Sequence, residues 1–484
     1  MSKVVPLPIN EFPYQDIDPM AIDDLSTELW DGFIKLIPNA SGIQKRTIKR
    51  PGLRKFSELS TNRRIDGEYW WDKKGWVISV SDGYMVKSIN SSGGLSTITG
   101  DLLNGTASRA TFADNGDYLA VANGGRIVYT DGTTATVVAD ADAPTNVTHI
   151  VFLDSWLLAN NAGTGQVYFA DFTSGAPSTW SALDVFTAES NPDNVIGLYT
   201  NQRFLCVVGR KSIEWFRNDG ATPFVRQEGS IYARGGMSPY SVVFANETGY
   251  MFDDRRRMCR MDAYAPVILS TPFDKLIQSF STVDDTTADY VTIDGNHFIL
   301  FQFPSQGVSL LYDFKSDCWS RVSYWNEETG EREAFIGSSY CFASDWNMHI
   351  FGSRKDGKIY QMSSSLYDDD GSPIMHTKRL GNLNHGSVKY RKVVYELDLL
   401  LKSGVGFGTS NATAPIFKLR WRDNGVGEWG SWIQISLGAQ GDVDFLYKLF
   451  QLGSYYSRQY EYMFTDAAPL VVSDAWEVLD INEH

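Results

Sequence analysis

The feature that most restricts the folds open to this chain is a strand-like element that recurs at a nearly constant spacing. Each element is a run of apolar or aromatic residues that follows a glycine or a polar turn, as in Gly125-Arg126-Ile127-Val128-Tyr129. Seven such elements can be aligned on one residue each, with neighbouring anchors 40 to 52 residues apart. The anchors are Met85, Ile127, Val167, Ile213, Met258, Leu310 and Ile359. This spacing is typical of the four-stranded blades of a β-propeller.

A second strand precedes the anchor in several units, for example at residues 118–122 and 203–208, so a hairpin repeats along the chain. Helical periodicity is almost absent. Radial closure is favoured over an open sheet because it hides strand edges that would otherwise promote aggregation. We therefore predict an all-β fold with a β-propeller of about seven blades. Six or eight blades, or two stacked β-sandwiches in place of the propeller, are the alternatives.

The pattern changes towards both ends of the chain. After Asp368-Asp369-Asp370-Gly371 the strands become longer, as at residues 392–399, which is typical of a β-sandwich. The first fifty residues contain five prolines, which prevent long regular elements. We predict three parts: a proline-rich arm lying on a neighbour or on the propeller at residues 1–54, a propeller at 55–372 and a C-terminal β-sandwich-like domain at 373–484.

Composition excludes several classes of protein. Hydrophobic residues make up 43% of the 484 residues and charged residues 21%, which indicates a folded chain. The net charge of −15 opposes tight binding to nucleic acid, because that affinity comes largely from Lys and Arg. No stretch approaches the length of a membrane span, and the amino terminus does not have the pattern of a secretion signal. The four cysteines, Cys206, Cys259, Cys318 and Cys341, are predicted to be buried free thiols, which suits assembly in a reducing cytoplasm.

One segment departs from the acidic character of the chain. It contains the basic residues Lys45, Arg46, Lys49, Arg50, Arg54, Lys55, Arg63 and Arg64. This cluster could contact DNA or an acidic neighbouring subunit, and the subunit contact is favoured because acidic copies in a ring need complementary patches.

Catalytic and metal-binding patterns are weak. The six histidines, which we expect at the surface or in turns, are too scattered to indicate a metal site: His149, His297, His349, His376, His385 and His484. Residues 253–257 superficially offer the carboxylates and the cationic clamp of a propeller glycoside hydrolase, but a solvated blade loop or a subunit contact is favoured. The glycines at 404, 406 and 408 lack the strand-to-helix setting of a phosphate site. We expect no enzyme activity and no cofactor or metal.

A third class of function, a carbohydrate-binding tail module, would need aromatic side chains exposed together on one face. The candidates are Trp70, Trp71, Trp76, Trp429 and Trp432. Alternating aromatics in strands more often belong to a core, so the exposure of these indoles would separate the two interpretations.

From residue 191 to the carboxyl end, the chain resembles the packaged-DNA stabilisation proteins of short-tailed bacteriophages, which form the hub or nozzle of the tail. The resemblance rests on an ordered series of short phrases and covers about three fifths of the chain. These phrases include residues 193–198, 209–216, 223–224, 235–243, 268–271, 311–313, 368–371, 404–406, 419–425, 452–454 and 466–469, and near the start residues 50–53. Gly295-Asn296-His297-Phe298 departs from the family pattern, in which Gly more often directly precedes His.

The resemblance implies a structural virion protein, assembled in the host bacterial cytoplasm and placed in the virion tail. It implies a homohexameric ring between an upstream head-to-tail adaptor ring and distal tail proteins such as a needle, tip or fibres. Double-stranded DNA would pass along the axis, so that the ring retains the packaged genome and conducts it during ejection. A carbohydrate-binding propeller or a glycoside hydrolase of a phage tail is the alternative function.

Overall fold

The structure, a computed structural model, describes most of the chain. The described residues are 3–11, 27–39, 42–60, 62–106, 109–188, 193–220, 224–269, 271–293, 295–402, 414–424, 428–439, 441–442 and 445–482. Two of the five prolines counted above, Pro13 and Pro19, lie outside these ranges. So do Pro223, Ser270, the glycines at 404, 406, 408 and 425, and His484, which belong to patterns described above.

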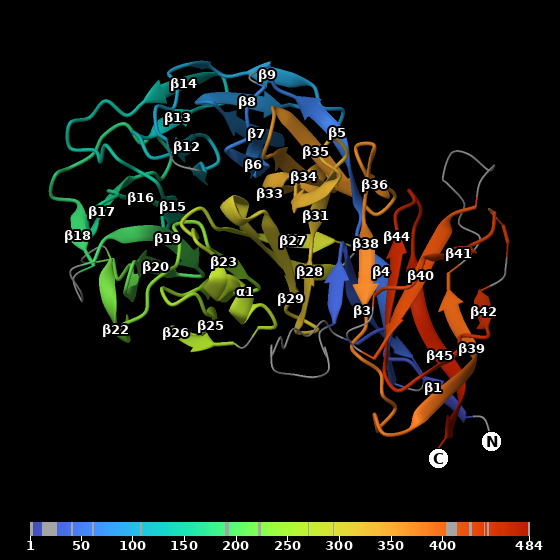
Figure 1. Cartoon of the computed structure of the whole chain (residues 1–484). Helices are drawn as coiled ribbons and strands as arrows, with labels where there is room; N and C mark the ends of the chain where they lie inside the picture. Colours follow the sequence, from blue (N-terminus) through green and yellow to red (C-terminus); the bar gives the residue numbers. More distant parts are fainter. Residues whose placement is uncertain are drawn as a thin grey trace.

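Short runs of alternating or continuous apolar residues form successive four-stranded antiparallel units, which follow one another around a ring (Figure 1). The first unit contains β6 (Gly67–Trp71), β7 (Trp76–Ser81), β8 (Tyr84–Ser88) and β9 (Leu95–Thr97). The second contains β11 (Thr111–Asp114), β12 (Leu119–Ala122), β13 (Val128–Thr130) and β14 (Thr134–Val137), with β10 (Thr99–Gly100) beside β14. The third contains β15 (Ile150–Leu153), β16 (Trp156–Asn160), β17 (Gln166–Asp171) and β18 (Val185–Thr187).

Three further units continue the ring. The fourth contains β19 (Val195–Asn201), β20 (Phe204–Gly209), β21 (Ile213–Arg217) and β22 (Val225–Tyr232). The fifth contains β23 (Val242–Ala245), β24 (Thr248–Phe252), β25 (Met258–Asp262) and β26 (Ala265–Ile268). The sixth contains β27 (Thr287–Ile293), β28 (Asn296–Phe303), β29 (Val308–Asp313) and β30 (Cys318–Arg321). The one α-helix among the described residues, α1 (Asp274–Ser279), links the fifth unit to the sixth. Short 3-10 turns lie at Asp72–Lys74, Pro304–Gln306 and Ser344–Trp346.

The seventh unit joins strands from distant parts of the chain. After the hairpin of β31 (Ser323–Asn326) and β32 (Glu331–Ala334), it contains β33 (Gly337–Ala343), β34 (Met348–Ser353) and β35 (Lys358–Ser363). Its outer strand is β5 (Gly52–Glu58), which pairs antiparallel with β35 and so closes the ring from the amino-terminal side. The short strands β36 (Asp368–Asp369) and β37 (Ser372–Pro373) then lead out of the propeller.

The remaining strands form two facing sheets. The first sandwich sheet contains β3 (Gly32–Asn39), β4 (Gly42–Lys49), β45 (Val471–Asn482), β39 (Arg391–Leu401) and β42 (Leu446–Phe450), with β1 (Lys3–Pro6) beside β45 and β43 (Ser454–Tyr455) beside β39. The second sandwich sheet contains β2 (Glu28–Trp30), β38 (His376–Arg379), β44 (Arg458–Phe464), β40 (Ile416–Asp423) and β41 (Ile433–Ser436). One core fills the space between them, with Leu397, Phe417, Tyr462 and Leu479 among its buried residues.

The all-β propeller fold predicted from the sequence is confirmed. Six of the seven anchors lie in the third strand of a unit, and Ile127 lies one residue before β13. Every anchor is buried, because the units pack face to face and bury these strands on both sides.

The predicted division at residues 54 and 372 stays a prediction, but the strand pairing crosses it. The boundary at 54 falls inside β5, since that strand belongs to the seventh unit. The described part of the predicted arm forms β1 to β4, which pair with β45 and β38 of the same chain. Its apolar residues Leu29, Phe33 and Ile34 are buried, which accounts for strands in a segment that its prolines had marked as irregular.

The sixth unit and the second sandwich sheet form one continuous sheet. Strand β2 pairs in parallel with β30 through Trp30 and Arg321, and antiparallel with β38. The propeller and the sandwich, side by side in Figure 1, are therefore joined by backbone hydrogen bonds as well as by the chain itself.

Candidate functional site

The predicted basic cluster divides between buried and exposed positions. Lys45 and Arg46 lie on β4, Lys49 ends that strand, and Arg50 lies in the link to β5. Arg54 and Lys55 lie on β5, and Arg63 and Arg64 precede β6. Lys49 and Arg50 are buried, Arg46 is half-buried and the other five are exposed, so the eight residues do not form one surface patch.

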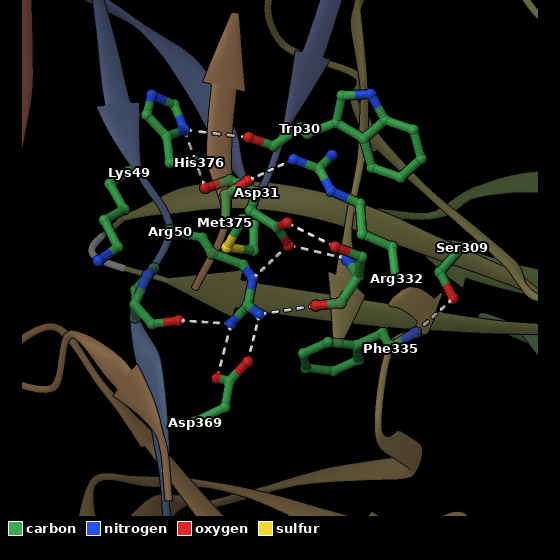
Figure 2. Close-up of polar contacts among 12 residues, drawn as sticks. Trp30, Asp31, Lys49, Arg50, Ser309, Arg332, Phe335, Asp369, Met375 and His376 are labelled. Atoms are coloured by element: carbon green, nitrogen blue, oxygen red, sulfur yellow. Dashed lines mark hydrogen bonds and ion pairs between the residues drawn. The ribbon is translucent and has the colours of Figure 1, made fainter. Parts of the chain in front are cut away.

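Arg50 is the centre of a buried junction between the propeller and the sandwich (Figure 2). Its Nε donates to Asp31 Oδ1 at 2.9 Å, and its Nη1 and Nη2 donate to the two carboxylate oxygens of Asp369 at 2.9 and 2.5 Å. Nη2 also donates to the carbonyl of Ser323 at 2.8 Å, and the guanidinium lies 5.2 Å from the centre of the Phe335 ring. Burial opposes its charge, but the attraction of Asp369 and Asp31 outweighs burial and raises the pKa of Arg50.

The hydrogen-bond partners of Arg50 come from three separate parts of the fold. Asp31 lies between β2 and β3, and it also accepts hydrogen bonds from the amide and hydroxyl of Ser323 at 2.8 and 2.6 Å. Ser323 begins the hairpin before the seventh unit, and Asp369 lies on β36 after it. Arg50 thereby connects four elements: the closing strand β5, the segment that enters the seventh unit, the segment that leaves it, and the sandwich.

Lys49 and His376 lie on the sandwich side of this junction. The Nζ of Lys49 donates to the carbonyls of Tyr367 at 2.9 Å and Asp466 at 2.6 Å. Burial, together with repulsion from Arg50, lowers the pKa of Lys49 to about 7. Nδ1 of His376 lies 3.0 Å from the carbonyl of Trp30, and burial lowers the pKa of His376 to about 4, so the ring is neutral and Nδ1 carries the proton.

Arg332 adds a further link across the junction. Its Nη2 donates to the carbonyl of Met375 at 2.8 Å and to the Thr377 hydroxyl at 2.7 Å. Its guanidinium lies 4.4 Å from the centre of the Trp30 ring, which Arg321 also approaches at 4.8 Å. These cations are therefore used to position strands and leave few donors for an external anion.

Three of the five exposed basic residues are paired with nearby carboxylates. Lys55 pairs with Glu58 at 3.1 Å, Arg63 with Asp82 at 3.3 Å and Arg64 with Asp66 at 2.8 Å. Arg63 and Arg64 line a hollow of about 710 Å³ at the seam between the seventh, first and second units, together with Asp66, Asp82, Arg354 and Lys355. Four cations and two carboxylates line it, so this hollow is locally basic although the chain as a whole is acidic.

An ion pair between Arg109 and Asp289 connects the second unit of the propeller to the sixth. The stacked rings of His149 and Tyr240, 4.8 Å apart, come from the third and fifth units. Arg109 also interacts electrostatically with Tyr240, so side chains from non-adjacent units meet near the middle of the ring. His149 and His376 are buried, and the expectation of surface or turn histidines is wrong for these two, because each ring is packed inside a polar network.

The residues that resembled a glycoside hydrolase site have structural partners. Asp253 is buried, and its carboxylate accepts hydrogen bonds from the amides of Arg255 and Arg257 at 2.9 and 2.8 Å and from the Arg257 side chain. It closes the turn between β24 and β25. Within the described residues, no group of three or more His, Cys, Asp or Glu side chains is arranged to hold a metal ion.

The candidate sugar-binding indoles are covered by other side chains. Trp71 is buried, Trp70 packs edge-on against Trp346 at 5.0 Å, and Lys87 lies 4.3 Å from the centre of Trp76. Arg420 lies over both remaining rings, at 4.8 Å from Trp429 and 4.2 Å from Trp432. These five indoles do not form an open stacking platform of the kind a sugar ring needs.

Sequence reasoning found Arg50 but missed the groups that hold it. Asp369 is 319 positions from Arg50, and the sequence marks residues 368–371 as a break between domains and as a family phrase but not as partners of an arginine. One chemical argument could have pointed to these partners: an arginine next to a buried strand must have carboxylates to neutralise its charge.

The chain is similar to one family model and to several solved structures. The family model described as bacteriophage P22 Gp10, β-propeller, matches residues 36–367. No curated protein matches the chain. Among solved structures, the extracellular domain of a one-component system from B. thetaiotaomicron is 10% identical with a TM-score of 0.45, covering 87% of this chain and 61% of that domain. YCF48 from Cyanidioschyzon merolae is 10% identical with a TM-score of 0.44, covering 64% of this chain and 98% of that protein.

The family model spans more than half of the chain and includes β4, Arg50, β5 and all seven units. The members of this family are structural proteins of the phage particle that stabilise packaged DNA. The chain therefore belongs to the family of the bacteriophage P22 Gp10 β-propeller protein.

Proposed function

We propose that this chain forms a ring around the DNA exit channel of a short phage tail, where it retains the packaged genome and conducts it during ejection. The observation that carries the proposal is the family match across residues 36–367, because that family acts in DNA stabilisation. The ring of copies would lie between an upstream head-to-tail adaptor ring and distal tail proteins, and six copies are expected.

The charge of the chain supports a passive conduit. A net charge of −15 gives each copy a repulsive field towards DNA phosphates, and three of the five exposed basic residues of the cluster are paired with carboxylates. A weakly repulsive wall lets DNA slide, whereas a wall that binds phosphates would oppose rapid ejection through many successive contacts. Retention would then be steric.

The rigid connection between propeller and sandwich suits a subunit that must resist the pressure of the packaged DNA. The continuous sheet from β27 to β41 and the Arg50 junction oppose movement between the two parts. Such a body can keep the bore of a ring constant while DNA under pressure passes through it.

The direct test is to compare particles assembled with and without this chain. Loss of the chain should give filled heads that leak DNA, and electron microscopy of complete tails should show several copies arranged around the axis. Particles that retain their DNA without the chain, or tails that contain it as a single copy, would contradict the proposal.

A further inference from the structure

The basic hollow at the seam of the propeller is built by turns from three neighbouring units (Figure 1). Its lining comes from the segment before β6 and the β7–β8 turn, from the segment before β11 and the β12–β13 turn, and from the β34–β35 turn. Its volume of about 710 Å³ lies within the range of about 300–1,000 Å³ that is usual for small-molecule sites. We call it the arginine hollow, and its charged lining residues are Arg63, Arg64, Asp66, Asp82, Arg354 and Lys355.

Backbone hydrogen bonds between these turns hold the walls of the arginine hollow in place. The amide of Leu103 donates to the carbonyl of Gly83 at 3.0 Å, which connects the second unit to the first. The amide of Ile65 donates to the carbonyl of Ser353 at 2.8 Å, which connects the first unit to the seventh. A side chain at position 83 would clash with the Leu103 carbonyl oxygen, so the glycine permits this close approach. The walls are therefore fixed by the fold itself.

Three of the four cations that line the arginine hollow are neutralised by carboxylates. Arg63 and Arg64 pair with the two lining carboxylates at 3.3 and 2.8 Å. Lys355 pairs with Glu333, which lies outside the lining. Arg354 is the fourth cation, and it carries the positive charge that the other groups do not balance.

Arg354 is held in the wall of the arginine hollow without a partner for its charge. Among the residues that the structure describes, it forms no ion pair, and its Nε and Nη1 atoms are buried without a hydrogen-bond partner. Burial outweighs the attraction of Asp285 and Glu333 and lowers the pKa of Arg354 to about 10. A buried cation that nothing compensates is costly. An anion in the hollow would compensate it.

We infer that the arginine hollow binds a phosphate group, whose charge compensates Arg354. A phosphate is favoured over a carboxylate because its oxygens point in several directions and can accept hydrogen bonds from all three units. Besides the cations, Asn62, Asn104 and Thr106 offer neutral polar groups there. The group is supplied by free phosphate or by the 5′-terminal phosphate of a DNA strand, which present the same chemistry. The inference does not depend on the proposed ring, because a single chain builds the whole hollow.

The first test measures binding of inorganic phosphate to the full chain by calorimetry and by thermal unfolding, at constant ionic strength. Saturable binding is expected, with a melting temperature that rises with phosphate concentration. Arg354→Gln should weaken the affinity roughly tenfold or more, because it removes a charged donor. Without phosphate this variant should melt no lower than the parent, since Nε and Nη1 have no hydrogen bonds to lose. Arg203→Gln, at an exposed residue in the β19–β20 turn, is the matched control and should bind phosphate like the parent.

The second test uses a substitution with the opposite expected sign. Asp82→Asn removes one of the two lining carboxylates and releases Arg63 from its ion pair. Phosphate binding should therefore become tighter, by roughly twofold to fivefold. Asparagine tolerates the positive φ of 51° at this position, so the turn should keep its conformation.

Three results would overturn the inference: no saturable effect of phosphate on the parent, equal affinity of the parent and Arg354→Gln, or an Arg354→Gln variant that melts well below the parent without phosphate. The last result would show that Arg354 stabilises the fold through its protein neighbours.

Short duplexes that differ only in a 5′-phosphate distinguish the two sources of the group. Tighter binding of the phosphorylated duplex by the parent, lost in Arg354→Gln, supports the site and assigns it to DNA ends. Equal binding of the two duplexes, together with saturable binding of inorganic phosphate, supports the site and assigns it to free phosphate.

Discussion

Arg50 shows how much of the stability of this fold depends on one side chain. Its guanidinium neutralises Asp31 and Asp369, both of which are buried, and also satisfies the Ser323 carbonyl. Removing one partner of a buried ion pair leaves an uncompensated charge, which costs far more than loss of a surface pair.

We therefore expect Arg50→Gln to destabilise the protein by about 3–5 kcal/mol. Lys55→Gln, which breaks an exposed pair with Glu58, should leave the free energy of unfolding almost unchanged. Denaturant unfolding of the two variants beside the parent measures both values. Equal losses in the two variants would show that the junction does not have the role described here.

Glu68 predicts a pH dependence of stability. It is buried on β6, its Oε2 accepts a hydrogen bond from Ser79 at 2.8 Å, and its Oε1 has no hydrogen-bond partner among the described residues. Burial raises the pKa of Glu68 to about 8. Between the ordinary pKa of about 4.3 and that value, the folded state holds a proton that the unfolded state has lost, so the free energy of unfolding falls as pH rises through this range.

Glu68→Gln should remove this pH dependence and raise the free energy of unfolding above pH 8. The gain should be on the order of several kcal/mol, because one pKa unit corresponds to about 1.4 kcal/mol. Thermal unfolding between pH 5 and 9 is the measurement, with Glu58→Gln on the exposed strand edge as the control. An unchanged pH profile in Glu68→Gln would show that Glu68 is ionised in the folded protein.

Single residues also show where sequence reasoning reaches its limit. Ile213 and Trp215 could be assigned to a buried strand from the local alternation alone, and both are buried on β21. Arg50 and Lys49 have the same local composition as the exposed Arg54 and Lys55, and only partners from distant segments decide which are buried. The charge pattern therefore identified the basic segment but could not show which of its residues are buried and which are exposed.

At the scale of elements, the five amino-terminal strands are distributed over three different sheets. β1 to β4 complete the sandwich, while β5 completes the seventh unit. The repeat spacing predicted the units formed by consecutive hairpins, because those pairings are local. Pairings such as β5 with β35 join residues some three hundred positions apart and leave no periodic signal in the sequence.

This arrangement changes the expected effect of an amino-terminal deletion. If residues 1–40 were only an arm lying on a neighbour, as the sequence suggests, their removal would impair assembly more than folding. The deletion also removes the buried residues Leu29, Phe33 and Ile34 and the Asp31 partner of Arg50, so we expect the sandwich to unfold. Limited proteolysis and circular dichroism would show this, with Val4→Ser, on the exposed face of β1, as a control that should stay folded. A truncated chain with the parent melting temperature would contradict the expectation.

At the scale of the whole molecule, the balance of charge decides how the chain meets DNA. The exposed members of the basic cluster are Lys45, Arg54, Lys55, Arg63 and Arg64, and three of them pair with carboxylates. Against a net charge of −15, they offer little release of counterions from DNA.

We expect the isolated chain to bind duplex DNA with a dissociation constant of roughly 100 μM or weaker near physiological salt. Replacing the five exposed basic residues by glutamine should therefore change the affinity little. Fluorescence anisotropy at low and moderate salt measures both proteins. Submicromolar, steeply salt-dependent binding that disappears in the glutamine variant would show that the cluster grips DNA directly, and the passive conduit would have to be abandoned.

The closing strand of the propeller also sets a timetable for biosynthesis. β5 emerges from the ribosome roughly 300 residues before β35, and at about 5–20 residues per second this delay lasts roughly 15–60 s. β4 can pair early with β3, but its other partner, β45, is made later still because it lies near the carboxyl end. Throughout that interval, strands at the start of the nascent chain lack partners that have not yet been synthesised. The yield of folded protein should therefore depend on chaperones and on a lower growth temperature more than the stability of the finished protein would suggest.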